Sequence, residues 1–362
     1  MSAAPLRIGT RASTLALTQS GQVGAALVEG TGHEVELVHV STRGDVDRTS
    51  LLSQIGGTGV FVTAVRQALL DGEVDVIVHS CKDLPTTPLE EITLACIPAR
   101  EEPRDALCAR DGMTLLQLPA GAKIGTGSPR RAAQLLRARP DLEVTAIRGN
   151  VETRLARALG EDADLDAVVL AASGLQRVGR DEVISELLPV EVMLPAPAQG
   201  ALAVEVAAHA LRGADGPAPD GGDGPAPDGG ADAGTSADAR AGADGRAEAD
   251  APAWFAARLA AVDDRATRAA VTAERALLRT LEAGCSAPVA AFAQIEDGAL
   301  RLRALTIRPD GTRVVESESS APFDVTADAA SGEGSVPMVL GADLAASLLE
   351  GGAGEILAEA KA

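Results

Sequence analysis

The chain has few cysteines and histidines, and few aromatic residues or lysines. Its four cysteines never have the CxxC spacing of a zinc or iron–sulfur site, and its four histidines do not cluster with them. It has one tryptophan, four phenylalanines and no tyrosine, and lysine occurs only at Lys82, Lys123 and Lys361 beside abundant arginine. We attribute this scarcity to genome composition, and the sequence predicts no metal site.

Long apolar runs are also missing. No stretch of the 362 residues reaches membrane-spanning length, and the amino-terminal residues MSAAPLRIGT lack the basic segment and apolar segment of an export signal. We therefore expect a cytoplasmic protein that does not bind membranes, and we expect it to act as a monomer.

Positive charge is scarce overall. The formal net charge is −20 at pH 7, which argues against nucleic-acid binding because neutralising phosphates requires a basic face. A net acidic protein can still contain an anion-binding cleft, and several arginines in this chain recur at particular positions.

Strand-like and helix-like runs alternate through the first two hundred residues, which predicts an α/β fold. Residues 74–78 are almost continuously apolar, as in a parallel strand that is covered on both faces. Two similar strand-and-helix sets follow one another, so we expect two α/β lobes with a cleft between them and a small α+β C-terminal domain. The predicted limits are residues 1–98 with 199–264, residues 99–198, and residues 265–362.

One segment differs from the rest in composition. Residues 213–253 consist mainly of Ala, Gly, Pro and Asp, and the octapeptide DGPAPDGG occurs twice in tandem, from Asp215 and from Asp223. Such a composition cannot bury enough apolar surface to offset chain entropy. We predict a disordered acidic insertion within the first lobe.

Polar motifs come directly after several predicted strands. In open α/β sheets, ligands bind at the edge where the strands end, so we expect these side chains to meet at one cleft. The positions are Arg11 after residues 6–9, residues 79–83 after 74–78, residues 126–131 after 123–125, residues 148–150 after 144–147, and Arg177 after 167–171.

The motif GTGSPRR predicts an anion site at the start of a helix. Ser128 suits the N-cap and Pro129 the first helical position, so N–H groups point outward there. Arg130 and Arg131 add two planar guanidinium groups suited to carboxylate or phosphate. Because two cations at a helix N-terminus oppose the macrodipole, anion binding is favoured over a solvated surface pair. Arg148, Arg154 and Arg177 repeat the theme, which indicates a ligand with several carboxylates or phosphates.

Asp83 and Cys285 are the candidate reactive groups. Lys82 favours the ionised form of Asp83 and burial opposes it, so Asp83 could donate a proton or stabilise a cation; the alternative is a capping residue next to Pro85. Cys285 lies in a Gly-Cys-Ser turn between a helical run and an apolar run, where it is either a reactive loop residue or a small buried hydrophobe.

Seven motifs in order resemble the porphobilinogen deaminase family. The resemblance covers residues from about 6 to 208 and from about 254 to 307, and leaves out the insertion. The motifs are RIGTRASTLALTQ, HSCKDLPT, GTGSPRRAAQL, IRGNVETRL, GLQRVG, PAPAQGALAVE and LEAGCSAPV.

The resemblance implies an enzyme of tetrapyrrole biosynthesis. The family joins four porphobilinogen molecules head to tail on a covalent dipyrromethane, releases ammonia, and hydrolyses the product to hydroxymethylbilane. Its fold is three domains, two of them similar to the lobes of periplasmic binding proteins. By motif, Cys285 carries the cofactor and Asp83 is catalytic. The other implied contacts are Ser80, Lys82, Thr126, Ser128, Arg130 and Arg131 for the cofactor, and Arg11, Arg148, Arg154, Arg177 and Gln199 for the substrate.

One loop departs from the family pattern. Many relatives resemble GGKGLFVKE where this chain reads GGTGVFVTA, so Thr58 and Thr63 stand where lysines are common. Any carboxylate contact from those lysines is lost unless arginines elsewhere replace it. The alternative to the enzyme is a two-lobed, non-catalytic binder of an anionic solute, against which the presence of both Asp83 and Cys285 counts.

Overall fold

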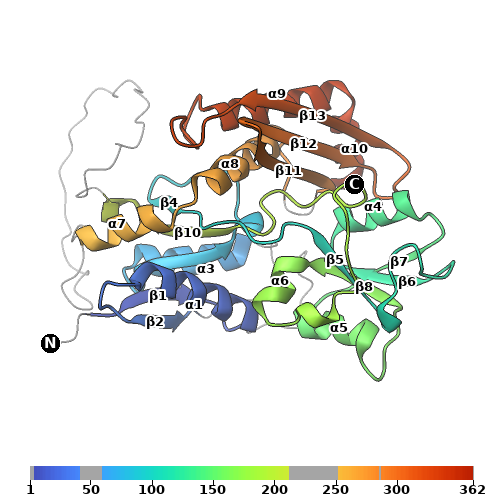
Figure 1. Cartoon of the computed structure of the whole chain (residues 1–362), viewed down its shortest axis with the longest axis horizontal. Coiled ribbons are helices and arrows are strands. Elements are labelled where there is room, and N and C mark those ends of the chain that lie inside the picture. Colours follow the sequence, from blue (N-terminus) through green and yellow to red (C-terminus); the bar gives the residue numbers. More distant parts are fainter. Residues whose placement is uncertain (1–3, 41–58, 212–251, 285–286, 362) are drawn as a thin grey trace, which may run out of the picture.

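The structure is a computed structural model that describes residues 4–40, 59–211, 252–284 and 287–361. In these ranges the chain forms three sheets with helices packed around them (Figure 1). Cys285 and Thr58 lie outside the described residues. The predicted insertion does too, except at its end, where Pro252 is the N-cap of helix α7 (Ala253–Val262) and Ala253 is its first residue.

The first sheet is mixed. Strand β1 pairs in parallel with β2 and β3, whereas β10 is antiparallel to β3 and β4, so a late segment of the chain completes this sheet. Helices α1 (Thr14–Val28) and α3 (Gly59–Leu70) follow β1 and β2 along the chain. The strand order is β2 (Val35–His39), β1 (Leu6–Thr10), β3 (Val76–Ser80), β10 (Leu202–Ala207) and β4 (Ile92–Cys96).

The second sheet repeats this pattern. Strand β6 is parallel to β7 and β8, and β5 is antiparallel to β8 and β9. Its helices are α4 (Pro129–Ala138), α5 (Val151–Leu159) and α6 (Ala172–Arg177). The strand order is β7 (Glu143–Ala146), β6 (Lys123–Thr126), β8 (Ala167–Ala171), β5 (Asp105–Ala109) and β9 (Glu186–Leu187).

Strand β5 is buried along its whole length. Leu107 and Ala109 belong to one core cluster, while Ala106 and Cys108 belong to another. Successive side chains of a strand point to opposite faces, so the second sheet is buried on both sides at β5.

Short 3-10 turns occur at η1 (Cys81–Asp83), η2 (Arg110–Gly112), η3 (Asp181–Val183) and η4 (Ala208–Leu211).

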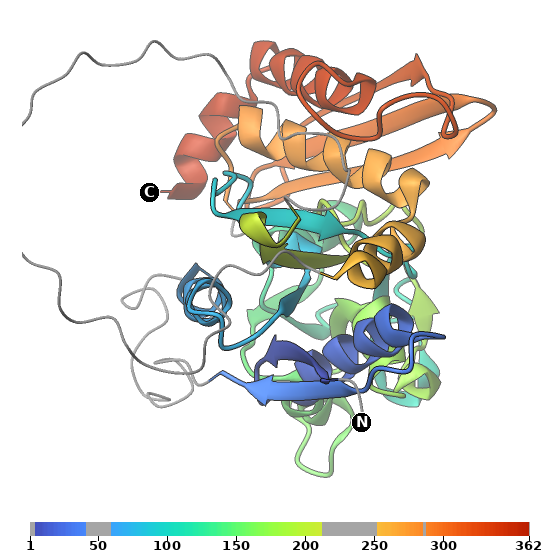
Figure 2. The same cartoon turned by 90° about the vertical axis from the view of Figure 1, so that its left-hand side faces the viewer.

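The C-terminal sheet is an antiparallel meander with one face covered by its own helices and the other covered only at one end, where Leu305 and Ile307 pack with Leu194. In β12, Leu300, Leu302 and Ala304 are buried while Arg301 between them is exposed. Figure 2 shows this sheet and its helices at the opposite end of the molecule from β2. The elements are β11 (Val289–Glu296), β12 (Ala299–Ile307), β13 (Val314–Pro322), α8 (Arg265–Thr280), α9 (Val336–Glu350) and α10 (Ala353–Lys361).

Helices α8 and α9 approach closely at Gly341. A Cβ atom there would lie 2.2 Å from the carbonyl oxygen of Ala273 on α8. We expect Gly341→Ala to lower the free energy of unfolding by about 1–3 kcal/mol, because overpacking forces backbone shifts, as measured by urea denaturation. Gly354→Ala on α10 is the control, since the nearest atom to its Cβ would lie 3.7 Å away. Equal effects of the two substitutions would contradict the close-contact argument.

Two connections cross between the first and second sheets and lie side by side. The amide of Glu101 in the first connection donates to the carbonyl oxygen of Gly200 in the second at 3.3 Å. Gly200 has a φ of +89°, and a Cβ atom there would lie 2.5 Å from the carbonyl oxygen of Glu101. The two backbones are therefore in direct contact, and glycine is required at this point.

Glu274 of α8 joins these connections to the C-terminal sheet. Its side chain is fully buried and forms an ion pair with Arg100 at 2.6 Å. The same carboxylate accepts hydrogen bonds from the amide of Ala198 and, at 2.7 Å, from the amide of Ala293 on β11. One buried side chain thus contacts both connections and the third sheet.

The predicted α/β class with two lobes and a small α+β C-terminal part is confirmed by these sheets, while the predicted domain limits stay a prediction. Strand β3 begins two residues later than expected, so His79 and Ser80 end the strand. No single described helix is long and apolar enough to cross a membrane; α9 and residues 353–360 meet that test only together, with a bend of 83° between them.

Candidate functional site

A small cavity lies at the carboxyl ends of β1 and β3. Arg11, which follows β1, lines it together with Ser13, Ser80 and Asp83, and its volume is about 140 Å³. Ser13 caps α1 by accepting the amide of Ala16 at 3.3 Å, so the chain turns away at once and leaves Arg11 in the loop. The first sheet therefore brings the predicted Arg11, Ser80 and Asp83 to one cavity.

Ser80 and Lys82 are held by amide side chains from other elements. Gln19 of α1 donates to Ser80 Oγ at 2.9 Å, and Lys82 Nζ donates to Gln199 Oε1 at 3.2 Å. Burial and, to a smaller extent, the neighbouring Arg131 lower the pKa of Lys82 to about 8, while Asp83 opposes the shift. A lysine in this environment gains from an additional anionic partner.

Arg130 and Arg131 are buried and bind a carboxylate that the sequence argument missed. Arg130 contacts Asp105 Oδ2 and Arg131 contacts Asp105 Oδ1, each at 2.8 Å. Asp105 is fully buried at the start of β5. Burial opposes its ionisation, but the two arginines outweigh that cost and hold its pKa below the usual value.

These two arginines therefore have a partner inside the protein, and their contact with the cofactor stays a prediction. Arg130 also donates to the carbonyl oxygen of Leu194 at 2.5 Å and is only 2% exposed, so its cation is neutralised inside the protein. The sequence did contain a signal for this contact, since Asp105 comes directly before the apolar run ALCA. A carboxylate next to a buried strand is seldom buried unless cations pair with it.

The start of α4 is as the sequence predicts. Ser128 is the N-cap and Pro129 occupies the first turn. Ser128 Oγ accepts the amide of Arg131 at 3.4 Å, and the amide of Ser128 donates to Thr126 Oγ1 at 3.3 Å. Thr126 and Ser128 thus shape the backbone at the end of β6, beside the buried arginine pair.

Arg154 and Arg148 lie in different environments. Arg154 is half-buried on α5, and its Nε has no hydrogen-bond partner among the described residues. Burial lowers the pKa of Arg154, and Arg131 lowers it further while Asp83 raises it. Arg148 is exposed and forms no ion pair with the described part of the chain. The charge of Arg154 therefore interacts with that of Asp83.

Arg177 and Gln199 contact the connections between the sheets. Arg177 pairs with Glu101 at 2.8 Å and donates to the carbonyl oxygen of Gly200 at 2.7 Å. Gln199 is fully buried, and its Nε2 donates to Asp105 Oδ1 at 2.8 Å. Because Gln199 Oε1 accepts from both Lys82 and Arg131, this amide links the first sheet to the buried arginine pair.

The cationic side chains around Asp83 fit a ligand with several carboxylates. Lys82 and Arg154 both have a pKa lowered by burial and by the same neighbouring cation, Arg131. A bound carboxylate would offset both the desolvation of these cations and their repulsion by Arg131. Thr63, where relatives often have lysine, is exposed on α3 and adds no charge. No group of three or more His, Cys, Asp or Glu side chains that could hold a metal ion occurs among the residues described.

Comparisons with known proteins agree with this chemistry. The family model described as "Porphobilinogen deaminase, dipyromethane cofactor binding domain" matches residues 6–212, and "Porphobilinogen deaminase, C-terminal domain" matches residues 268–350. The chain is 46% identical to the porphobilinogen deaminase of Thermobifida fusca, over 100% of this chain and 98% of the relative. It is 47% identical to that of Micrococcus luteus, over 91% of this chain and 86% of the relative.

Among solved structures, the periplasmic aliphatic sulphonate binding protein of Escherichia coli is similar over 57% of this chain and 61% of its own, with 13% identity and a TM-score of 0.33. That likeness is too slight to support an argument about this molecule. The family models together cover most of the chain, and the named relatives cover nearly all of it. The chain therefore belongs to the porphobilinogen deaminase family.

Proposed function

We propose that the cavity beside Asp83 joins four porphobilinogen molecules head to tail, with release of ammonia, and that hydrolysis then yields hydroxymethylbilane. The observation that carries this proposal is the charge around Asp83. One carboxylate lies among cations, and the pKa values of Lys82 and Arg154 are lowered by burial and by mutual repulsion with Arg131. A chain of pyrroles bearing acetate and propionate groups matches that excess of positive charge.

Asp83 is the proposed catalytic group. Loss of ammonia leaves a cation on the substrate, and a fixed carboxylate stabilises such a charge more strongly than water does. The same carboxylate accepts hydrogen bonds from pyrrole nitrogens and helps to move their protons. The turn η1 at the end of β3 holds Asp83 at the cavity wall.

The cofactor's place is proposed from the same residues. Dipyrromethane, when bound, supplies the pyrrole carbon to which the first substrate is joined. Lys82 and Arg154 would bind its carboxylates or those of the substrate, with Arg11, Arg148 and Ser80 as further contacts. Arg130 and Asp105 would act indirectly, by fixing Arg131 and Gln199 beside Lys82.

The proposed attachment of the cofactor to Cys285 has a direct test. Protein expressed in a host that makes porphobilinogen is denatured, and its intact mass is measured. We expect a mass above the sequence value by one dipyrromethane, and its loss in Cys285→Ala, because only a thiolate at that position forms the thioether.

Cys108→Ala is the matched control, because Cys108 is buried in the second sheet and its replacement should leave the added mass in place. An unmodified wild-type chain, or an added mass that survives in Cys285→Ala, would contradict the attachment. An unmodified chain that also fails to consume porphobilinogen would support a non-catalytic binder of an anionic solute instead.

Lys82 should give the reaction a pH limit on the alkaline side. Its pKa is lowered to about 8, so it is charged below that pH and loses its proton above it. We expect kcat/KM for porphobilinogen to fall as the pH rises through about 8, because this parameter reports ionisations of the free enzyme. Lys82→Arg should remove this decrease at alkaline pH, since arginine stays charged.

The exposed Lys123 is the control for this measurement, and Lys123→Arg should keep the wild-type profile. If the dependence of kcat/KM on pH is the same in Lys82→Arg as in the wild type, the decrease at alkaline pH belongs to another group.

We also propose that the enzyme acts as a cytoplasmic monomer. In support of that compartment, Cys81, Cys96 and Cys108 are free thiols, as is usual where the surroundings are reducing. The limits of the three domains remain as predicted from the sequence.

A further inference from the structure

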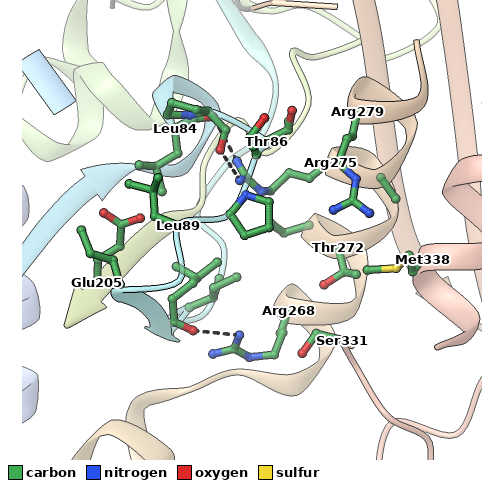
Figure 3. A pocket seen from close by; sticks show the side chains of 18 of the residues that line it. Leu84, Thr86, Leu89, Glu205, Arg268, Thr272, Arg275, Arg279, Ser331 and Met338 are labelled. Atoms are coloured by element: carbon green, nitrogen blue, oxygen red, sulfur yellow. Dashed lines mark hydrogen bonds between the residues drawn. The ribbon is translucent and has the colours of Figure 1, made fainter. Parts of the chain in front are cut away.

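A second and larger cavity lies between the first sheet and the C-terminal part. Its volume is about 320 Å³, at the lower end of the roughly 300–1,000 Å³ typical of small-molecule sites. Figure 3 shows residues of α8 on one side and Leu84, Leu89 and Glu205 on the other. It shares no lining residue with the cavity that contains Asp83, so it is a separate site.

Most of the wall is apolar. Ile92 and Leu94 of β4 and Ile97 beyond its end contribute aliphatic side chains, and Val271 of α8 and Met338 of α9 complete the lining. Such a surface favours an apolar ring.

Two of the arginines at the wall are already neutralised. Arg66 pairs with Glu205 at 2.5 Å, and Arg268 pairs with Asp263 at 2.6 Å. Neither contributes net charge to the cavity.

Arg275 and Arg279 differ from them. Arg275 donates to the carbonyl oxygens of Leu84 at 3.1 Å and Pro85 at 2.6 Å, which carry no full charge. Arg279 is exposed one helical turn further along α8. Neither guanidinium lies within 4.0 Å of a carboxylate of the described residues, so both charges face the cavity without a counter-ion there.

We propose that this cavity binds a small carboxylate with an apolar ring. The carboxylate lies against Arg275 and Arg279, whose spacing of four residues places them on the same face of α8. The ring lies among the aliphatic side chains of β4 and α8. Charge-assisted hydrogen bonds fix the orientation, and contact between the ring and the apolar wall favours this ligand over an anion with no apolar part, such as inorganic phosphate.

The site is linked to the catalytic cavity through Arg275. Its guanidinium holds the carbonyl oxygens of Cys81 and Leu84, which flank Asp83, at 3.5 and 3.1 Å. Asp83 lines one cavity and its neighbour Leu84 lines the other. A ligand that binds Arg275 therefore changes the contacts of the η1 turn, and the two sites are coupled.

The test uses phthalate, a benzene ring with two carboxylates, titrated by calorimetry into the full-length holoenzyme. We expect binding to weaken at least ten-fold in Arg279→Gln, which removes a charge from the cavity at an exposed position. Arg301→Gln is the matched control, because Arg301 is exposed on β12 outside the cavity, and it should bind as the wild type does. The neutral analogue phthalamide should bind at least ten-fold more weakly than phthalate.

A second variant fills the cavity. Thr272 of α8 lines it and is half-buried, so Thr272→Phe should abolish the binding that depends on Arg279, with thermal denaturation used to verify its fold. Equal affinities of wild type and Arg279→Gln, tight binding of phthalamide, or unchanged binding in Thr272→Phe would overturn the site. Hydrogen exchange of amides 81–84 should change when phthalate is added, and unchanged exchange on binding would overturn the coupling.

Discussion

Replacing Asp83 by asparagine is expected to lower kcat for porphobilinogen by about 100- to 10,000-fold, the usual contribution of a positioned acid or base. Asparagine has the same shape but neither accepts a proton nor carries the charge that stabilises a cation. Asp83 lies in a half-buried turn at the cavity wall, so the substitution should leave the fold intact. Ammonia release measures the rate, and thermal denaturation measures the stability.

Asp71→Asn is the control for a lost carboxylate, because Asp71 is exposed just beyond α3 and contacts only Gln67 among the side chains described. Its turnover should match the wild type. A kcat for Asp83→Asn within a few-fold of the wild type would remove Asp83 from the chemistry and leave it as a turn residue.

Replacing Asp105 by alanine is expected to have the largest effect on stability. The substitution leaves Arg130 and Arg131 buried with no carboxylate, and breaking a buried ion pair in this way costs about 3–5 kcal/mol. Asp105 also accepts from Gln199 at 2.8 Å, so the loss extends to the connection between the sheets. Urea denaturation followed by circular dichroism measures the change.

Asp141→Ala is a suitable comparison, because Asp141 forms an ion pair with Arg139 at an exposed position and surface pairs contribute little. Its effect on unfolding should be much smaller than that of Asp105→Ala. Similar effects for both would show that water reaches the arginine pair and that Asp105 is not its main counter-charge.

Local signals predicted the parts of the site that depend on neighbours in the sequence. The start of α4 followed from Ser128 and Pro129, whose preferences act within one helical turn. The positions of Arg11 and Asp83 followed from the rule that ligands bind where parallel strands end. Both kinds of inference need only the order of residues along the chain.

Partners distant in sequence could not be predicted in this way. Asp105 lies 25 residues before Arg130 and 94 before Gln199, and no periodicity indicates that these side chains meet. The sequence therefore indicated an anionic ligand for the two arginines but not their carboxylate partner inside the protein. The partner of Arg177 was missed for the same reason, since Glu101 lies on the connection between the sheets.

Strand β13 and helices α9 and α10 were not predicted as elements of the C-terminal part. The β13 sequence VVESESSAP carries serine and glutamate on its exposed face, so its period of two contains little apolar signal. Helix α9 depends on contact with α8, where Gly341 allows the two backbones to approach.

The paired connections at Glu101 and Gly200 also have a mechanical consequence. The two connections touch each other along their backbones. We therefore expect the second sheet to move relative to the first mainly by rotation about the point where the connections touch. Glu274 binds Arg100 and Ala198 on these same connections. The C-terminal part is therefore attached at the point about which we expect the rotation. We expect such a rotation to leave the buried contacts of Glu274 intact.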